Sequence, residues 1–101
     1  MVTTSGSKTD VIVKAVCGYY GYDLKAFRSH KQTAHLASSR QILAYMLCEI
    51  DGRSSTEIGK MLDRDHATII HACHAVKTNM HRRSRDIEKI KAVIQTQGLQ
   101  I

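Results

Sequence analysis

Histidines and a cysteine cluster in the middle of the chain, at His66, His71, Cys73 and His74. These residue types bind zinc or take part in nucleophilic catalysis. Zinc would need four converging ligands, but on a helix Cys73 points about 100° away from its neighbour His74. Nothing in the pattern supplies an oxyanion site for a cysteine–histidine pair. The sequence therefore predicts no metal site, no cofactor, no small-molecule substrate and no catalytic activity.

The same region, RDHATIIHA at residues 64–72, has residue types suited to a DNA groove. His66 can hydrogen-bond a base edge, and Asp65 can accept a hydrogen bond from a cytosine amino group. Ala67 and the methyl group of Thr68 are slim enough to touch a thymine methyl. Asp65 equally suits the N-cap of a helix, where its carboxylate would bind a free backbone N–H. Both interpretations require a helix that begins beside Asp65.

A short helix, a tight turn and a longer helix would position these residues. Ser54 and Glu57 have the S-x-x-E spacing of a capping box, which predicts a short helix ending near Asp63. The next helix is expected from Asp65 to about Met80. In a helix-turn-helix of this kind the second helix enters the major groove of DNA. An αα-hairpin without a DNA role has the same apolar pattern.

Other helical patterns surround this pair. The longest lies in LASSRQILAYMLCEIDG and ends at Gly52. Its apolar residues at helical spacing are Ile42, Leu43, Met46, Leu47 and Ile50. The remaining segments are expected to be helices over about 10–18 (with Asp10 as cap), 23–27 and 84–96, a loop over 29–35, and a basic break over 81–86.

Composition indicates one all-α domain of about six helices. The chain has 101 residues, no proline, no tryptophan and one phenylalanine, so its core must be aliphatic. We expect a flexible segment over 1–8, the helical domain over 9–97 and a tail over 98–101. The odd number of cysteines, three, predicts reduced thiols within helices rather than a disulfide framework. No apolar run reaches the ~20 residues that cross a bilayer, which favours a cytoplasmic location without a membrane partner.

The charge of the chain points to a polyanionic partner. The formal net charge is +6, which favours double-stranded DNA over a merely soluble basic domain. Arg64 in the predicted turn, together with Lys31 and Lys77, would meet phosphates of the DNA backbone. The basic run 77–86 is either a further phosphate contact or a solvated helix end.

The segment SSRQILAYMLCEIDGRSSTEIGKMLDRDHATIIHAC resembles the C-terminal DNA-binding domain of the bacterial chromosomal replication initiator DnaA. That family combines an R-Q pair at the start of a helix, E-I-G in the next helix and then R-D-H-T-T-V-L-H-A-C. The matching residues here are Arg40-Gln41, Glu57-Ile58-Gly59, Arg64-Asp65-His66-Ala67-Thr68 and His71-Ala72-Cys73. The resemblance implies a helix-turn-helix fold of the DnaA C-terminal, Trp-repressor-like type. It also implies that the protein is nucleoid-associated and binds double-stranded DNA in a way that resembles recognition of the DnaA box in replication initiation.

The resemblance also implies residue roles. It implies DNA base contacts at Asp65, His66, Ala67 and Thr56, the last in place of the family's usual proline. It implies DNA backbone contacts at Arg40, Gln41, Thr68 and His71, to which the charge argument adds Arg64, Lys31 and Lys77.

This sequence departs from the family in several places. Ala67 replaces the first threonine of the signature, and Asp63 replaces a glycine pair. The loop before Arg40, arginine-rich in the family, has Lys31 as its only full charge, with Gln32 near the position of the minor-groove arginine. A weaker loop suits the competing hypothesis, a module with a protein partner or a small regulator with weak or nonspecific DNA binding. The phosphate-binding motif G-x-x-x-x-G-K-[ST] of an ATPase is absent, so we expect either an excised domain or a free-standing relative.

Overall fold

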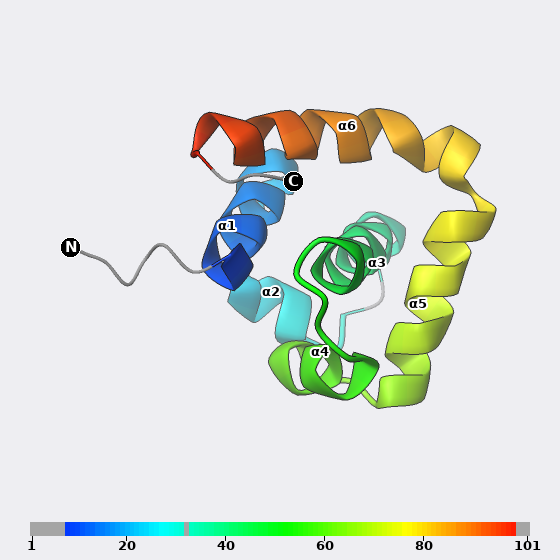
Figure 1. Ribbon diagram of the computed structural model, residues 1–101. Helices are drawn as coiled ribbons and strands as arrows, with labels where there is room; N and C mark the ends of the chain where they lie inside the picture. The colour runs from blue at the N-terminus through cyan, green and yellow to red at the C-terminus, as the bar shows by residue number, and fades with distance from the viewer. Residues whose placement is uncertain (1–7, 32, 99–101) are drawn as a thin grey trace.

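Helix α3 (Ala34–Glu49) lies at the centre of the computed structural model, and Figure 1 looks along its axis with the other helices around it. The structure describes residues 8–31 and 33–98. Within them the other helices are α1 (Lys8–Tyr20), α2 (Leu24–Arg28), α4 (Ser55–Leu62), α5 (His66–Thr78) and α6 (Met80–Thr96). The predicted all-α fold of about six helices is confirmed for this part of the chain.

The central position of α3 follows from apolar side chains that surround the helix instead of covering one stripe. Ile42, Leu43, Met46 and Leu47 are fully buried, as predicted, whereas Ile50 just beyond the helix is half-buried. These side chains pack against α1, α2, α4 and α5. Each such burial contributes about 1.5–3 kcal/mol. In the described residues no helix is both long enough and apolar enough to span a membrane.

The first and last helices are joined by a carboxylate. Tyr19 and Tyr20 of α1 each donate a hydrogen bond to Asp86 of α6, one to each carboxylate oxygen and both at 3.0 Å. Burial, and then the bond to Asp86, raises the pKa of the Tyr20 phenol above its usual range. Tyr20 therefore remains a neutral donor to Asp86 at neutral pH.

The predicted basic break over 81–86 is wrong, because α6 already begins at Met80 and runs through these residues. The interruption lies at Asn79, whose φ of −106° and ψ of 29° separate α5 from α6. No proline or glycine occurs from 80 to 86, and arginine is a good helix former. The basic residues therefore lie on a helix whose charged side chains mostly face solvent.

Three expectations near the N-terminal half also need correction. Helix α1 begins at Lys8, so Asp10 lies in its first turn and is not its cap. A negative charge in the first turn still stabilises a helix through the helix dipole. Helix α3 begins at Ala34, which shortens the loop expected over 29–35. Lys8, expected in the flexible segment, is instead the first residue of α1. The rest of that segment, 1–7, and residues 99–101 of the expected tail lie outside the described residues. The short helix α2 agrees with its prediction, and the Asp23 carboxylate accepts from the Ala26 N–H at 2.8 Å.

Two local devices define α4. The predicted capping box is confirmed, because the Ser54 hydroxyl accepts from the Glu57 N–H at 3.2 Å and the Glu57 carboxylate accepts from the Ser54 N–H at 3.1 Å. At the other end Asp63 adopts left-handed dihedrals, φ 55° and ψ 50°. The N–H groups of Asp63 and Arg64 both donate to the Gly59 carbonyl. A Cβ at Gly59 would lie 2.5 Å from the Arg64 carbonyl oxygen, so the turn requires glycine there.

We predict that Gly59→Ala destabilises the chain by roughly 1–3 kcal/mol, because the added methyl overpacks against the Arg64 carbonyl. The matched control is Gly18→Ala in α1, where nothing lies within 4 Å of an added Cβ. Alanine there should stabilise the helix by about 0.5–1 kcal/mol. Urea unfolding followed by circular dichroism measures both changes. A Gly59→Ala midpoint equal to that of the unchanged chain would contradict this account of the turn.

Candidate nucleic-acid interface

Two adjoining grooves border the N-terminal half of α5. The first, called the α4–α5 groove, is lined by Thr56, Gly59, Lys60, Asp63, Arg64, Asp65 and His66. The second, called the α3–α5 groove, is lined by Ala37, Arg40, Gln41, Ala44, Arg64, Thr68, Ile69, His71, Ala72 and Ala75. Arg64 lines both grooves. The structure thus brings together most of the residues that the sequence assigned to DNA contact.

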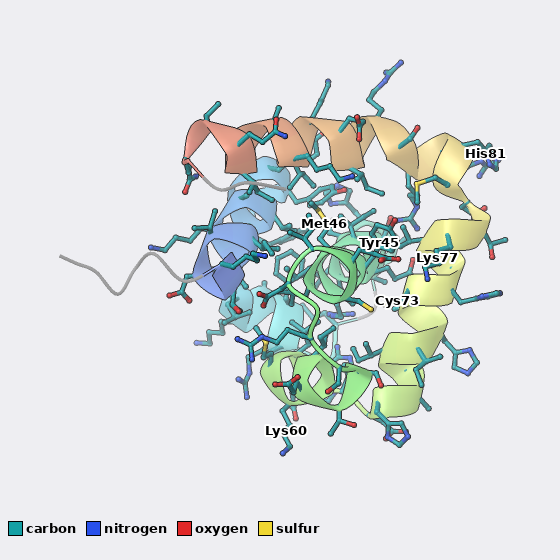
Figure 2. All side chains as sticks on the ribbon, in the orientation of Figure 1. Tyr45, Met46, Lys60, Cys73, Lys77 and His81 are labelled. Atoms are coloured by element: carbon teal, nitrogen blue, oxygen red, sulfur yellow. The ribbon has the colours of Figure 1, made fainter. Side chains whose placement is uncertain are left out.

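The α4–α5 groove contains three of the four predicted base contacts: Thr56, Asp65 and His66. It also contains Lys60, which the sequence analysis did not single out. Figure 2 shows Lys60 projecting outward from α4. Because Lys60 follows Thr56 by one helical turn, the i, i+4 spacing was the available signal. Ala67, the fourth predicted base contact, is half-buried in the first turn of α5.

Asp65 stands at the N-cap of α5, as predicted, but its side chain makes no capping hydrogen bond. Its carboxylate oxygen instead lies 3.3 Å from Nδ1 of His66. Both side chains are open to solvent, with exposed fractions of 70% for Asp65 and 60% for His66. The predicted cap bond is therefore wrong, and the carboxylate faces outward beside the imidazole.

Arg40 is the buried cation of the α3–α5 groove, with an exposed fraction of 8%. Its Nε donates to the Phe27 carbonyl at 2.7 Å. Its Nη2 donates to the carbonyls of Ser29 at 3.1 Å and Lys31 at 3.4 Å. Burial, and then the charge of Arg64, lowers the pKa of this guanidinium. Arg40 therefore holds the segment between α2 and α3 against the body of the domain.

Arg64 reaches the same segment from the other side. Its guanidinium donates to the carbonyls of Asp63 at 3.0 Å and Leu62 at 3.3 Å, and also to that of Ser29. Close by, Nε2 of His30 lies 3.5 Å from the Asp63 carboxylate. Two guanidinium groups thus converge on one carbonyl, that of Ser29. The result is a concentration of positive charge where the two grooves meet.

Gln41 is also held from within the protein. Arg83 of α6 donates to the Gln41 side-chain oxygen at 2.9 Å and to the Ser38 carbonyl at 3.2 Å. This arginine belongs to the basic run for which the sequence offered two roles. In the structure it binds α3, whereas its neighbours Arg82 and Arg85 are exposed.

Two predicted backbone contacts lie away from the grooves. Lys77 is on the C-terminal half of α5, where its ammonium lies 3.3 Å from the Glu49 carboxylate. Figure 2 shows Lys77 well separated along α5 from the end that approaches α4. Lys31 is exposed in the segment before α3. Gln32, the residue near the family's minor-groove arginine, lies outside the described residues.

The histidine and cysteine side chains of α5 do not form a metal site. In residues 8–31 and 33–98, no three His, Cys, Asp or Glu side chains come together closely enough to hold a metal ion. His71 and His74 are exposed, whereas Cys73 is half-buried toward α3. The geometry of α5 therefore offers polar contacts to an external surface rather than a metal centre.

Comparison with known proteins gives a family match over most of these elements. The model of the family described as bacterial dnaA protein helix-turn-helix matches residues 9–76. Proteins named chromosomal replication initiator protein DnaA, from a Thermoanaerobacter species and from Thermoanaerobacter pseudethanolicus, are each 37% identical over 84 residues. The protein of that name from Caldanaerobacter subterraneus subsp. tengcongensis is 36% identical over 84 residues. Each match covers 80% of this chain and 19% of the relative, so the chain spans about a fifth of their length.

We predict that Arg40→Ala lowers the free energy of unfolding by roughly 2–3 kcal/mol, because it leaves the buried Phe27 carbonyl without its charged donor and removes the bonds to Ser29 and Lys31. Arg40→Lys should also destabilise, since an ammonium cannot reproduce the planar fork of the guanidinium. The matched control is Arg82→Ala, an exposed position where the change should stay within about 0.5 kcal/mol. Urea unfolding of the three variants tests this. If Arg40→Ala and Arg82→Ala unfold alike, Arg40 does not hold the segment before α3.

Proposed function

Because the chain belongs to the bacterial DnaA helix-turn-helix family, we propose that it binds double-stranded DNA with sequence preference, in a manner resembling recognition of the DnaA box in replication initiation. The role is binding without catalysis, and in a cell such a chain is nucleoid-associated. One observation supports this more than any other: the two adjoining grooves beside α5 gather residues assigned separately to bases and to phosphates.

The N-terminal turn of α5 reads the bases in this proposal. Asp65 and His66 are exposed at the tip of the helix, and Ala67 adds little bulk, so the helix end can approach the floor of the major groove. The Asp65 carboxylate lies 3.3 Å from Nδ1 of His66, and the imidazole beside it offers hydrogen-bonding nitrogens to a base edge. Thr56 on α4 offers a methyl and a hydroxyl to the same groove.

The α3–α5 groove receives the DNA backbone. Gln41, Thr68 and His71 line it with hydrogen-bonding groups, and the guanidinium groups of Arg40 and Arg64 supply positive charge beneath them. These arginines act from a position already fixed by carbonyl bonds, so binding costs little side-chain entropy. Lys60 and Lys31 are exposed cations that add phosphate contacts at the edges.

We predict that DNA affinity depends steeply on salt. If about four phosphates are neutralised, the slope of log K against log salt should be near −3.6. Fluorescence anisotropy with a labelled duplex at several salt concentrations gives this slope. A flat response would exclude the proposed function, and no binding at low salt would favour a role in protein interaction instead.

We predict that substitutions at base-contact and backbone-contact residues change DNA binding differently. The measurement is a competition between duplexes with and without a DnaA box, at one fixed salt concentration. His66→Ala should narrow the preference for the box, since losing one base contact costs about 1–3 kcal/mol. Ala67→Thr should strengthen it by restoring the family's hydroxyl. Lys31→Gln should weaken binding to both duplexes alike and reduce the slope of log K against log salt by about one.

Lys31→Gln is the matched backbone control, because this side chain is exposed. Arg40 is unsuitable for that purpose, since its guanidinium also holds the segment before α3. If His66→Ala weakens binding to both duplexes equally, the histidine contacts only the DNA backbone. The assignment of base reading to the tip of α5 would then be wrong.

A further inference from the structure

Two cysteines from different helices line a third groove. Cys48 of α3 and Cys73 of α5 both line it, together with Ile58, Ile70, His74 and Lys77. Both thiols are free and half-buried. The Cys48 thiol lies close enough to Cys73 to raise the pKa of the Cys73 thiol. Figure 2 shows Cys73 between α5 and α3.

The third cysteine provides an internal comparison. Cys17 lies on α1 and is also free and half-buried. Figure 1 places α1 and α5 on opposite sides of α3. Cys17 therefore shares the chemistry of the pair but has no thiol neighbour on α5.

We propose that Cys48 and Cys73 form a dithiol site that reacts with a small disulfide of the glutathione type and becomes an intramolecular disulfide joining α3 to α5. A thiolate of the pair attacks the small disulfide, forms a mixed disulfide and releases one small thiol. The other cysteine then attacks the protein-bound sulfur, closes the Cys48–Cys73 bond and releases the second small thiol. The protein loses two electrons and two protons, and the small disulfide becomes two thiols.

The surroundings of the pair shape this reaction. Burial, and then the neighbouring Cys48 thiol, raises the pKa of Cys73 to about 11, while the charge of Lys77 acts in the opposite direction. Thiolate is the attacking species, so Cys73 is mostly unreactive at neutral pH and reacts faster as the pH rises. The position of both cysteines in one groove then favours closure, because the second attack is intramolecular. The first attack on the small disulfide is thus slow at neutral pH, whereas formation of the Cys48–Cys73 bond is fast.

The test is incubation of the native chain with oxidised glutathione, followed by acid quenching and intact-mass analysis. The expected main product has lost two hydrogens and retains one thiol, and proteolytic mapping should join the peptides of Cys48 and Cys73. Cys17→Ser should give the same cross-link. Cys48→Ser and Cys73→Ser should instead stop at the glutathione adduct. The yield of cross-link should rise with pH.

A parallel incubation in denaturing urea separates folded geometry from simple thiol chemistry. Unfolded chain should distribute its disulfides among all three cysteines, whereas the native chain should give one pairing. The cross-linked chain should also melt at a higher temperature than the reduced chain, because the unfolded state is constrained. The proposal is overturned if the native chain yields only separate glutathione adducts, or if the main cross-link includes Cys17. It is also overturned if no reaction occurs at raised pH.

Discussion

The close approach of Gly59 to the carbonyl of Arg64 is the constraint on which the candidate interface depends. With only 2.5 Å between that oxygen and a Cβ at Gly59, α4 and the start of α5 can pack this closely only because the side chain is absent. The left-handed backbone of Asp63 begins the turn that leads through Arg64 and Asp65 into α5. The direction of α5, and so the exposure of Asp65 and His66, follows from this contact. Helix α4 orients α5 and also brings Thr56 and Lys60 to the α4–α5 groove.

The arginines beside this turn stabilise the fold, and in the proposed function they also attract the DNA backbone. Arg40 and Arg64 donate to backbone carbonyls of the segment before α3, which is an internal, stabilising role. Their charges nevertheless remain beside the surface where α3 and α5 form a groove. A cation held by carbonyl dipoles keeps its full charge and cannot swing away. If this surface binds DNA as proposed, its cations are already in place before the DNA arrives.

Sequence patterns predicted the elements that have local signals and missed those that depend on distant partners. Ser54 and Glu57 marked the start of α4 correctly, because a capping box is made by residues three apart. The run 81–86 was misjudged, because its charges suggested a break although nothing in it disfavours a helix. The steric role of Gly59 depends on a close contact with the Arg64 carbonyl, five residues further along the chain, which no sequence pattern reveals. The carbonyl partners of Arg40 lie on another segment, so its charge was visible in the sequence but its burial was not.

The bond between the chain's first and last helices has a consequence for how the protein opens. Both oxygens of Asp86 are occupied by phenols of α1, so neither α1 nor α6 can separate without breaking the pair. Fraying usually starts at chain ends, where few contacts hold the backbone. Here α1 and α6 are held together through Asp86, so we expect their amides to exchange with solvent as one cooperative unit.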